Sequence, residues 1–160
     1  MMTNQTKPIK IIQAGLTELD LVAPLFDLYR VFYKQPSDLE AARKYIKERM
    51  ENQESVIFLA VEEDNTGEGP KPLGFVQLYP TFSSVSMKRL WILNDLYVVQ
   101  EARKRGIGRA LMEKAREYVF APDVQGLMLR TAIDNYPAQS LYESLGYERD
   151  TQFYRYDLKF

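Results

Sequence analysis

The fold is decided by an apolar run, Leu90–Val99, and by the segment Arg103-Lys104-Arg105-Gly106-Ile107-Gly108 that follows it. A helical pattern, Arg109–Ala115, begins directly after the second glycine. The first N–H groups of a helix have no partner within the helix, and the helix dipole adds partial positive charge there. Gly106 and Gly108 let the backbone approach a ligand without a Cβ in the way. A strand, a glycine loop and a helix in this order predict a site that holds a phosphorylated cofactor by its pyrophosphate.

The composition excludes several kinds of chemistry. The chain has 160 residues, which suits one domain spanning residues 1–160, and it contains no cysteine and no histidine. The absence of these two residue types excludes disulfides, thiol nucleophiles, Ser-His-Asp triads and nearly every zinc or iron site. No clustered acidic motif indicates a magnesium or calcium site, so we expect no metal.

The charge and hydropathy patterns limit the classes of partner that the chain is expected to bind. The net charge is −1, so the basic loop is a local feature and we expect no nucleic-acid partner. Residues 1–10 are polar and lack an apolar signal core, and no run of 18 apolar residues occurs. We therefore expect a cytoplasmic protein without a membrane partner.

Apolar periodicity predicts a mixed α/β chain with the element order β-α-α-β-β-β-α-β-α-β. The expected strands are Ile9–Ala14, Val56–Val61, Leu73–Tyr79, Leu90–Val99, Gly126–Ile133 and Phe153–Leu158. The expected helices are Thr17–Tyr33, one opened by a capping box at Ser37–Glu40, one after the glycine loop that ends before Pro122, and Pro137–Leu145. Pro24 predicts a kink or a later start in the first helix.

Two motifs carry a resemblance to a known family. Val98, followed five residues later by Arg103-x-x-Gly106-x-Gly108, resembles the acetyl-CoA pyrophosphate loop of the GNAT superfamily of N-acetyltransferases. The segment Asn135-x-x-Ala138-x-x-x-Tyr142-Glu143-x-x-Gly146-Tyr147 resembles the second cofactor motif of that superfamily. The resemblance implies a GNAT-like fold, with a central, mostly antiparallel sheet that is splayed between its fourth and fifth strands and flanked by helices.

The resemblance also implies acetyl-CoA as the cosubstrate. The residues that it assigns to cofactor binding are Leu96, Tyr97, Val98, Val99, Arg103, Lys104, Arg105, Gly106, Ile107, Gly108, Arg109, Asn135, Ala138 and Tyr142. Tyr142 is in addition the candidate general acid for the CoA thiolate. Core packing of Tyr142 and a simple helix-cap role for Asn135 are the alternatives.

Asp95 is conspicuous because aspartate is a poor strand former and lies here within an apolar strand. An unpaired carboxylate in a central strand would cost several kcal/mol. Period-2 alternation places Asp95 with Leu93 and Tyr97, and a bulge would change that parity. The run 93–98 is similar to the matching strand of spermidine/spermine N-acetyltransferases, which carry Glu-Asp where this chain has Asn94-Asp95. Asp95 is thus the candidate that orients the amine and relays its proton through water, and a structural hydrogen bond is the alternative.

The reaction implied is transfer of an acetyl group from acetyl-CoA to a primary amine of a small molecule, such as a polyamine or an amino acid. Asp95, Tyr33 and Tyr79 are the candidate substrate residues, and Asn94 joins Asp95 and Tyr142 as a candidate catalytic residue. Further aromatic side chains could line the same pocket: Tyr29, Phe82 and Trp91. For each of the aromatic residues, packing in the core is the alternative. A homodimer is common in the superfamily, and the aromatic C-terminal segment could serve it. The alternatives are a protein lysine or N-terminal acetyltransferase, a non-catalytic acetyl-CoA-binding regulatory module, and a phosphate-binding interaction domain.

Overall fold

The computed structural model describes residues 7–64 and 66–160. The chain divides into a larger unit that ends at Leu129 and a smaller unit, Arg130–Phe160.

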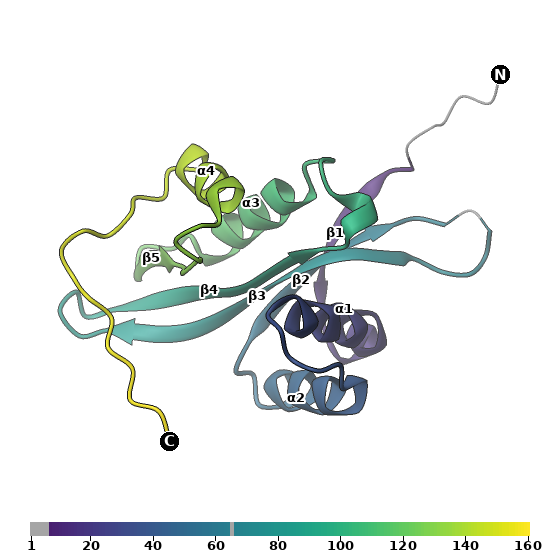
Figure 1. Cartoon of the computed structure of the whole chain (residues 1–160), viewed down its shortest axis with the longest axis horizontal. Helices are drawn as coiled ribbons and strands as arrows, with labels where there is room; N and C mark the ends of the chain where they lie inside the picture. The colour runs from purple at the N-terminus through teal and green to yellow at the C-terminus, as the bar shows by residue number, and fades with distance from the viewer. Residues whose placement is uncertain (1–6, 65) are drawn as a thin grey trace. The chain divides into compact units, whose positions relative to one another are not determined.

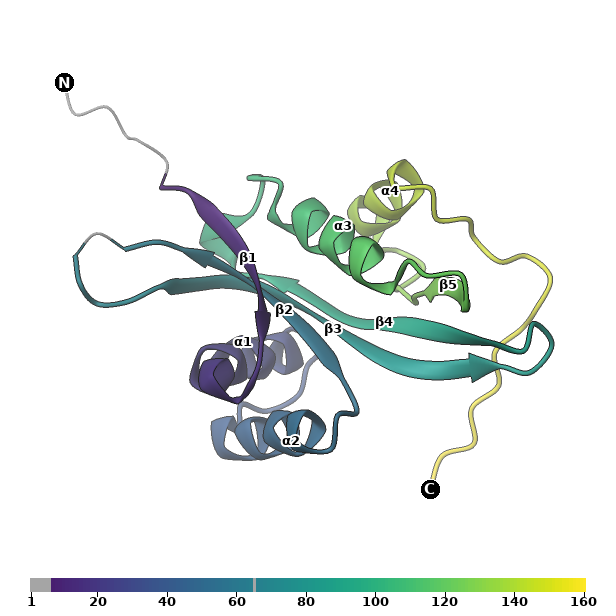
Figure 2. The same ribbon diagram turned by 180° about the vertical axis from the view of Figure 1, so that it is seen from behind.

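The larger unit is a five-stranded sheet with helices on both faces, as expected for a mixed α/β chain. Its strands are β1 (Ile9–Ala14), β2 (Val56–Glu62), β3 (Lys71–Ser83), β4 (Lys88–Val98) and β5 (Val124–Met128). Its helices are α1 (Leu19–Phe32), α2 (Leu39–Glu51) and α3 (Ile107–Val119), with short 3-10 turns at Leu16–Glu18 and Gln100–Ala102. Helices α1 and α2 cover one face of the sheet and α3 covers the other (Figures 1 and 2).

The strands lie in the order β1-β2-β3-β4-β5, and every neighbouring pair is antiparallel except the parallel pair β4–β5. β4 pairs with β5 only over Arg89–Ile92, whereas its pairing with β3 continues as far as Val98 opposite Gly74. Within the described sheet, the half of β4 that follows Ile92 therefore has a partner on one side only. This confirms the expected splay between the fourth and fifth strands.

A bulge in β4 sets which residues face which helices. Gln77 of β3 lies opposite Asp95, but the next residue, Leu78, lies opposite Leu93, so Asn94 has no counterpart. One extra residue on one strand reverses the alternation of the side chains beyond it. Asp95 consequently shares the α1/α2 face with Gln77 instead of the α3 face with Leu93.

Apolar side chains fill both faces of the sheet. On the α1/α2 face, Phe26 stacks on Tyr45 with ring centroids 5.4 Å apart and meets Phe75 edge-on at 6.4 Å. On the other face, Tyr118 of α3 packs edge-on against Phe58 and Trp91 at 5.4 and 5.9 Å. These contacts pack the sheet between the two layers of helices.

α1 starts at Leu19, later than the expected start at Thr17, and Pro24 lies inside it, where it has no N–H to donate to the helix. One expectation for the N-terminal helices is wrong. α2 is capped by Asp38 and not by Ser37, because the Asp38 carboxylate accepts from the N–H of Ala41 at 3.0 Å. The Ser37 hydroxyl donates instead to the buried Asp27 carboxylate at 2.6 Å.

The smaller unit contains α4 (Tyr136–Ser144), which is close to the predicted helix Pro137–Leu145. Gly146 has φ +91° and ends the helix, with the N–H of Tyr147 donating to the carbonyl of Tyr142 at 3.1 Å. The predicted last strand, Phe153–Leu158, is wrong, since these residues are exposed and form no strand.

The fifth strand, in the larger unit, is also shorter than predicted and starts earlier, at Val124. Alternating apolar residues form a strand only where a sheet edge pairs with them, and the sequence does not report that edge.

Candidate active site

A cavity of about 520 Å³ lies on the α1/α2 face of the sheet. Its lining comes from α1, α2, the connection between them, β3 and β4: Phe26, Tyr29, Arg30, Tyr33, Gln35, Ala41, Ala42, Tyr45, Tyr79, Asn94 and Asp95. A volume in this range suits a small-molecule ligand. Because of the bulge at Asn94, the Asp95 carboxylate lines this cavity.

Asp95 is 3% exposed and is held by side-chain amides. The Gln77 Nε2 donates to its Oδ2, and the Asn94 Nδ2 donates to its Oδ1 at 3.0 Å. The Tyr29 hydroxyl donates to the main-chain carbonyl of Asn94 at 3.4 Å, which ties α1 to the bulge. Two amide donors on opposite oxygens fix the orientation of the carboxylate toward the cavity without neutralising its charge.

Burial raises the pKa of Asp95 above its ordinary value, although hydrogen bonds from Gln77, Tyr29 and Asn94 act in the opposite direction. A carboxylate with a raised pKa is a stronger base than one in water. Burial also raises the pKa of Tyr33, and the negative charge of Asp95 adds to that effect. The pKa of Tyr79 is likewise raised, by burial first and then by its hydrogen bond with Tyr45. Tyr33 and Tyr79 therefore stay protonated near neutral pH, and neither acts there as a tyrosinate base.

The tyrosine hydroxyls extend the polar network away from Asp95. Gln77 Nε2 also donates to the Tyr79 hydroxyl at 3.0 Å, and the hydroxyls of Tyr79 and Tyr45 lie 2.7 Å apart. Gln77 is fully buried, and its Oε1 has no partner among the described residues. The sequence carried a signal for it, since a glutamine inside an apolar strand is as unusual as the aspartate opposite, but Gln77 was not among the predicted residues.

Of the aromatic residues expected to lie either in a pocket or in the core, some line the cavity and others do not. Tyr29, Tyr33 and Tyr79 line the cavity. Trp91 is buried on the α3 face, and Phe82 is exposed at the far end of β3, where Arg89 lies over its ring. Both residues are thus outside the cavity, because the strand position that sets their face depends on pairing register and not on residue type.

The glycine loop has the backbone conformation that the sequence predicts. Gly106 is the N-cap of α3 with φ +75°, and no side chain caps this helix. Lys104 is also left-handed, with φ +65°. The N–H groups at the start of α3, beginning at Ile107, are donors of the kind that binds phosphate oxygens.

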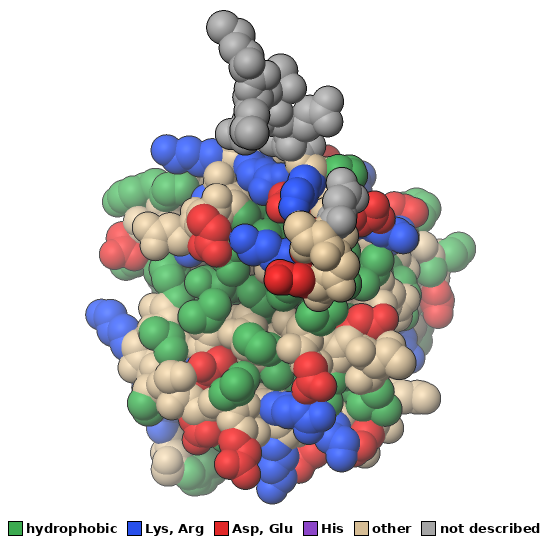
Figure 3. All heavy atoms as spheres, turned by 90° about the vertical axis from the view of Figure 1, so that its right-hand side faces the viewer, with side chains coloured by type: hydrophobic (Ala, Val, Ile, Leu, Met, Phe, Trp, Pro, Cys, Tyr) green, Lys and Arg blue, Asp and Glu red, His purple; other side chains and the backbone are tan. Residues whose placement is uncertain are grey.

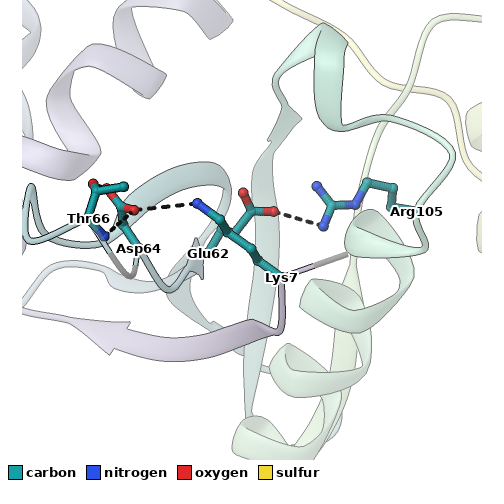
Figure 4. Close-up of polar contacts among 5 residues, drawn as sticks. All are labelled: Lys7, Glu62, Asp64, Thr66 and Arg105. Carbon is teal, nitrogen blue, oxygen red and sulfur yellow. Dashed lines mark hydrogen bonds and ion pairs between the residues drawn. The ribbon is translucent and has the colours of Figure 1, made fainter. Parts of the chain in front are cut away.

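The basic side chains of the loop are anchored unequally. The Arg105 guanidinium pairs with Glu62 at the end of β2 at 2.9 Å, in the region where Lys7 pairs with Asp64 (Figure 4). Arg103 donates from Nε to the Val98 carbonyl at 3.1 Å. Acidic and basic side chains are interspersed over the face of the molecule drawn in Figure 3, so this face has no uniform positive field. Local backbone donors, more than a basic surface, suit this loop to an anion.

The open edge of β4 supplies further donors. The N–H of Val99 donates to the Leu73 carbonyl at 2.9 Å, so it is engaged on the β3 side. Since backbone groups alternate in direction along a strand, the N–H groups of Leu96 and Val98 point to the opposite side, where β5 pairing has ended. These two outward N–H groups are available to the polar groups of a ligand at this edge of β4.

The second predicted cofactor motif lies in the smaller unit. The Asn135 side chain caps α4 by accepting from the N–H of Ala138 at 3.3 Å, as the helix-cap alternative holds. Tyr142 lies on α4 with its ring 6.2 Å from that of Tyr147. Asn135, Ala138 and Tyr142 thus belong to one short helix and its cap.

A family model described as Acetyltransferase (GNAT) family matches residues 22–147. The chain belongs to this family. It is 49% identical over 150 residues to an uncharacterized N-acetyltransferase, YhfO, of Bacillus subtilis, covering 94% of this chain and 97% of that protein. It is 32% identical to a probable acetyltransferase of Haemophilus influenzae, covering 88% of this chain and 90% of that protein.

Solved structures agree on the fold. The crystal structure of a probable acetyltransferase matches with a TM-score of 0.85 and 43% identity, over 94% of this chain and 97% of that one. The structure of AAC(6')-Iy in complex with the bisubstrate analogue CoA-S-monomethyl-acetylneamine matches with a TM-score of 0.72 at 18% identity, over 95% of this chain and 99% of that one. The protein is accordingly an acetyltransferase of the GNAT type. No helix in the described part of the chain has the length and apolarity needed to cross a bilayer.

Proposed function

We propose that the protein transfers an acetyl group from acetyl-CoA to the primary amine of a small molecule, such as a polyamine, an amino acid or a related amine. The observation that carries this proposal is the buried Asp95 carboxylate, which is held by two amide donors and faces a tyrosine-lined cavity of about 520 Å³. One buried negative charge among aromatic rings is complementary to an ammonium group.

The larger unit fits acetyl-CoA through its backbone. In this proposal, the N–H groups of Leu96 and Val98 hold the pantetheine arm and polarise the acetyl carbonyl. The N–H groups of the segment 104–109 hold the pyrophosphate. Val99 cannot contribute its N–H, because Leu73 already accepts from it. The resemblance of the segment 135–147 to the second cofactor motif is the ground for proposing Asn135, Ala138 and Tyr142 of the smaller unit as cofactor residues as well.

The chemistry makes deprotonation of the amine the main task of the residues in the cavity. Acetyl-CoA supplies the acetyl group as a thioester, so a C–N bond forms, the C–S bond breaks and CoA leaves as a thiol. An alkylamine with a pKa of about 10.4 is neutral in only about 1 molecule in 2,500 at pH 7, which is a penalty of roughly 4.6 kcal/mol. We assign to Asp95 the orientation of the ammonium group and the relay of its proton to water. Asn94 acts through its amide on Asp95 and not as a base.

Tyr142 is the proposed general acid that protonates the leaving sulfur. The expected contribution of a positioned acid is about 10²–10⁴ in rate. Tyr142→Phe should lower kcat at least about tenfold and leave the affinity for acetyl-CoA within a few-fold. Tyr136→Phe, an exposed tyrosine at the start of the same helix, is the matched control. Unchanged turnover in the Tyr142 variant would remove it from this role.

We further propose that residues 1–160 form one functional domain, because the family match at residues 22–147 extends across the boundary between the two units. A homodimer is proposed on the exposed aromatic side chains of the C-terminal segment, Phe153, Tyr154 and Tyr156. Light scattering at several protein concentrations tests the dimer, and a monomer at all of them would refute it.

The first experiment is a CoA-release assay with a thiol reagent. Acetyl-CoA is offered with polyamines, amino acids, aminoglycosides and lysine peptides, and the protein adds no thiol background because it has no cysteine. Turnover with one class of small amine supports the proposal. Turnover with lysine peptides alone would favour a protein acetyltransferase. Thermal stabilisation by acetyl-CoA without any turnover would favour a regulatory module.

A further inference from the structure

We propose that Arg30 forms an anion subsite in the Asp95 cavity, and that the acceptor is a small amine that also carries one carboxylate, as an amino acid does, instead of a polycation. This inference rests on the proposed function and narrows its substrate class. It starts from the charges in the cavity lining. Of the lining residues, Asp95 and Arg30 are the two that carry a charge, and the others are aromatic, small or neutral polar.

Arg30 lies in the last turn of α1, and its side chain is only partly exposed. In the described chain it takes part in no ion pair and no side-chain hydrogen bond. The acidic residue one turn earlier, Asp27, is not available to it, because the Asp27 carboxylate accepts from the Ser37 hydroxyl at 2.6 Å and from the Asp38 N–H at 2.8 Å. The guanidinium therefore retains its five donors in a geometry that suits a carboxylate.

The C-terminal end of α1 supplies a structural reason for a basic residue at this position. A cation in the last turn interacts favourably with the helix dipole, but this effect is modest and does not require a place in the lining of a cavity. Other basic residues nearby have acidic partners, such as Arg43 with Asp20 at 2.8 Å and Arg49 with Glu54 at 2.7 Å. Arg30 differs from both in facing a ligand-sized space without a counter-ion.

The balance of charge separates the candidate substrates. A polyamine or an aminoglycoside carries several positive charges, and this lining offers it one carboxylate together with one repelling guanidinium. A zwitterion matches both groups, with its amine at Asp95 and its carboxylate at Arg30. The rings of Tyr29 and Tyr33, with centroids 4.9 Å apart, line the same cavity and provide an apolar wall for the body of the substrate.

The test compares acids with the same molecules lacking the acid. L-leucine, L-phenylalanine and L-lysine are assayed beside 3-methylbutylamine, 2-phenylethylamine and cadaverine. L-leucinamide, in which a neutral amide replaces the carboxylate, and spermidine, a polycation, complete the set. For at least one pair, kcat/KM should favour the amino acid by about tenfold or more. Arg30→Gln should lower kcat/KM for that amino acid about tenfold and leave the matching amine within about twofold, with Arg30→Lys retaining part of the preference.

Lys44→Gln is the matched control, since it removes the same charge from an exposed position on α2 that does not line the cavity. A preference of the wild type for spermidine, for the decarboxylated amines or for leucinamide would overturn the inference. An equal loss of kcat/KM in Arg30→Gln for the amino acid and for its decarboxylated amine would also overturn the inference.

If no amine is acetylated, the proposed function fails, and thermal denaturation with the same pairs still decides the subsite. Stabilisation by an amino acid but not by its decarboxylated form, lost in Arg30→Gln, supports the anion subsite. Equal stabilisation by both members, or none by either, overturns it.

Discussion

Gly74→Ala is expected to damage both the stability of the sheet and the binding of acetyl-CoA. Gly74 lies opposite Val98, where β3 and β4 approach closely. A Cβ at this position would lie 2.7 Å from the carbonyl oxygen of Tyr97, 3.2 Å from the Val98 Cγ2 and 3.3 Å from the Val98 Cα. Two of these three atoms belong to the backbone, so no side-chain rotation relieves the overlap and the strands must move apart.

The magnitude follows from that overlap. Overpacking a buried position costs about 1–3 kcal/mol, and in a chain of this size each kcal/mol shifts Tm by roughly 2–4 °C. We therefore expect the unfolding free energy of Gly74→Ala to fall by about 2 kcal/mol and its Tm to fall by about 4–8 °C. Displacement of the Tyr97 carbonyl also reorients the N–H groups of Leu96 and Val98, so kcat/KM for acetyl-CoA should fall by about tenfold.

Gly126→Ala in β5 is the matched control, because a Cβ there meets nothing within 4 Å and its φ is not positive. It should leave stability unchanged or raise it by about 0.4–1 kcal/mol through the unfolded state. Chemical denaturation gives both free energies, and acetyl-CoA titrations in the CoA-release assay give the kinetic effect. If the two alanine variants are equally stable and bind acetyl-CoA alike, the close approach at Gly74 is not the constraint described here.

Two further changes test Asp95 and the connection between α1 and α2. Burial raises the pKa of Asp95 in the folded protein above 3.8. Protonated Asp95 therefore contributes stability below pH 3.8, and this stability is lost as the pH rises through the folded-state pKa. Asp95→Asn lacks the titrating group, so its unfolding free energy should fall less than that of the wild type over the same pH range. Parallel stability curves in denaturant at a series of pH values would contradict this, and an unchanged KM for the amine would make Asp95 a structural residue. Asp27→Ala leaves the Ser37 hydroxyl and the Asp38 N–H without their acceptor, which should lower the unfolding free energy by about 1–3 kcal/mol. The KM for the amine should rise, because the end of α1 that carries Tyr33 is held less firmly. Asp20→Ala is its control, since the exposed pair with Arg43 is worth about 0–1 kcal/mol; equal losses in the two variants would remove the special role of Asp27.

The sequence predicted the parts of this protein that depend on local physics. The order of strand, glycine loop and helix was readable because Gly106 has to adopt a left-handed conformation and because helical spacing follows it directly. The α4 helix was equally readable from the Asn135 cap and the Gly146 stop. The unusual position of Asp95 could also be recognised from the sequence. A carboxylate in an apolar strand needs a hydrogen-bonding partner or has a functional role, whichever face of the sheet it lies on.

What only the tertiary structure decided is the face on which Asp95 lies and the residues that surround it. Simple alternation assigns Asp95 to the face of Leu93, and the bulge at Asn94 transfers it to the face of Gln77 and the tyrosines. That bulge is a property of the pairing between β3 and β4, so no local pattern in β4 alone specifies it. Arg30, which forms no ion pair among the described residues, likewise became a candidate ligand site only through the tertiary structure, where it lines the cavity on the α1/α2 face. Distance along the chain does not report which acidic side chains lie near a guanidinium in space.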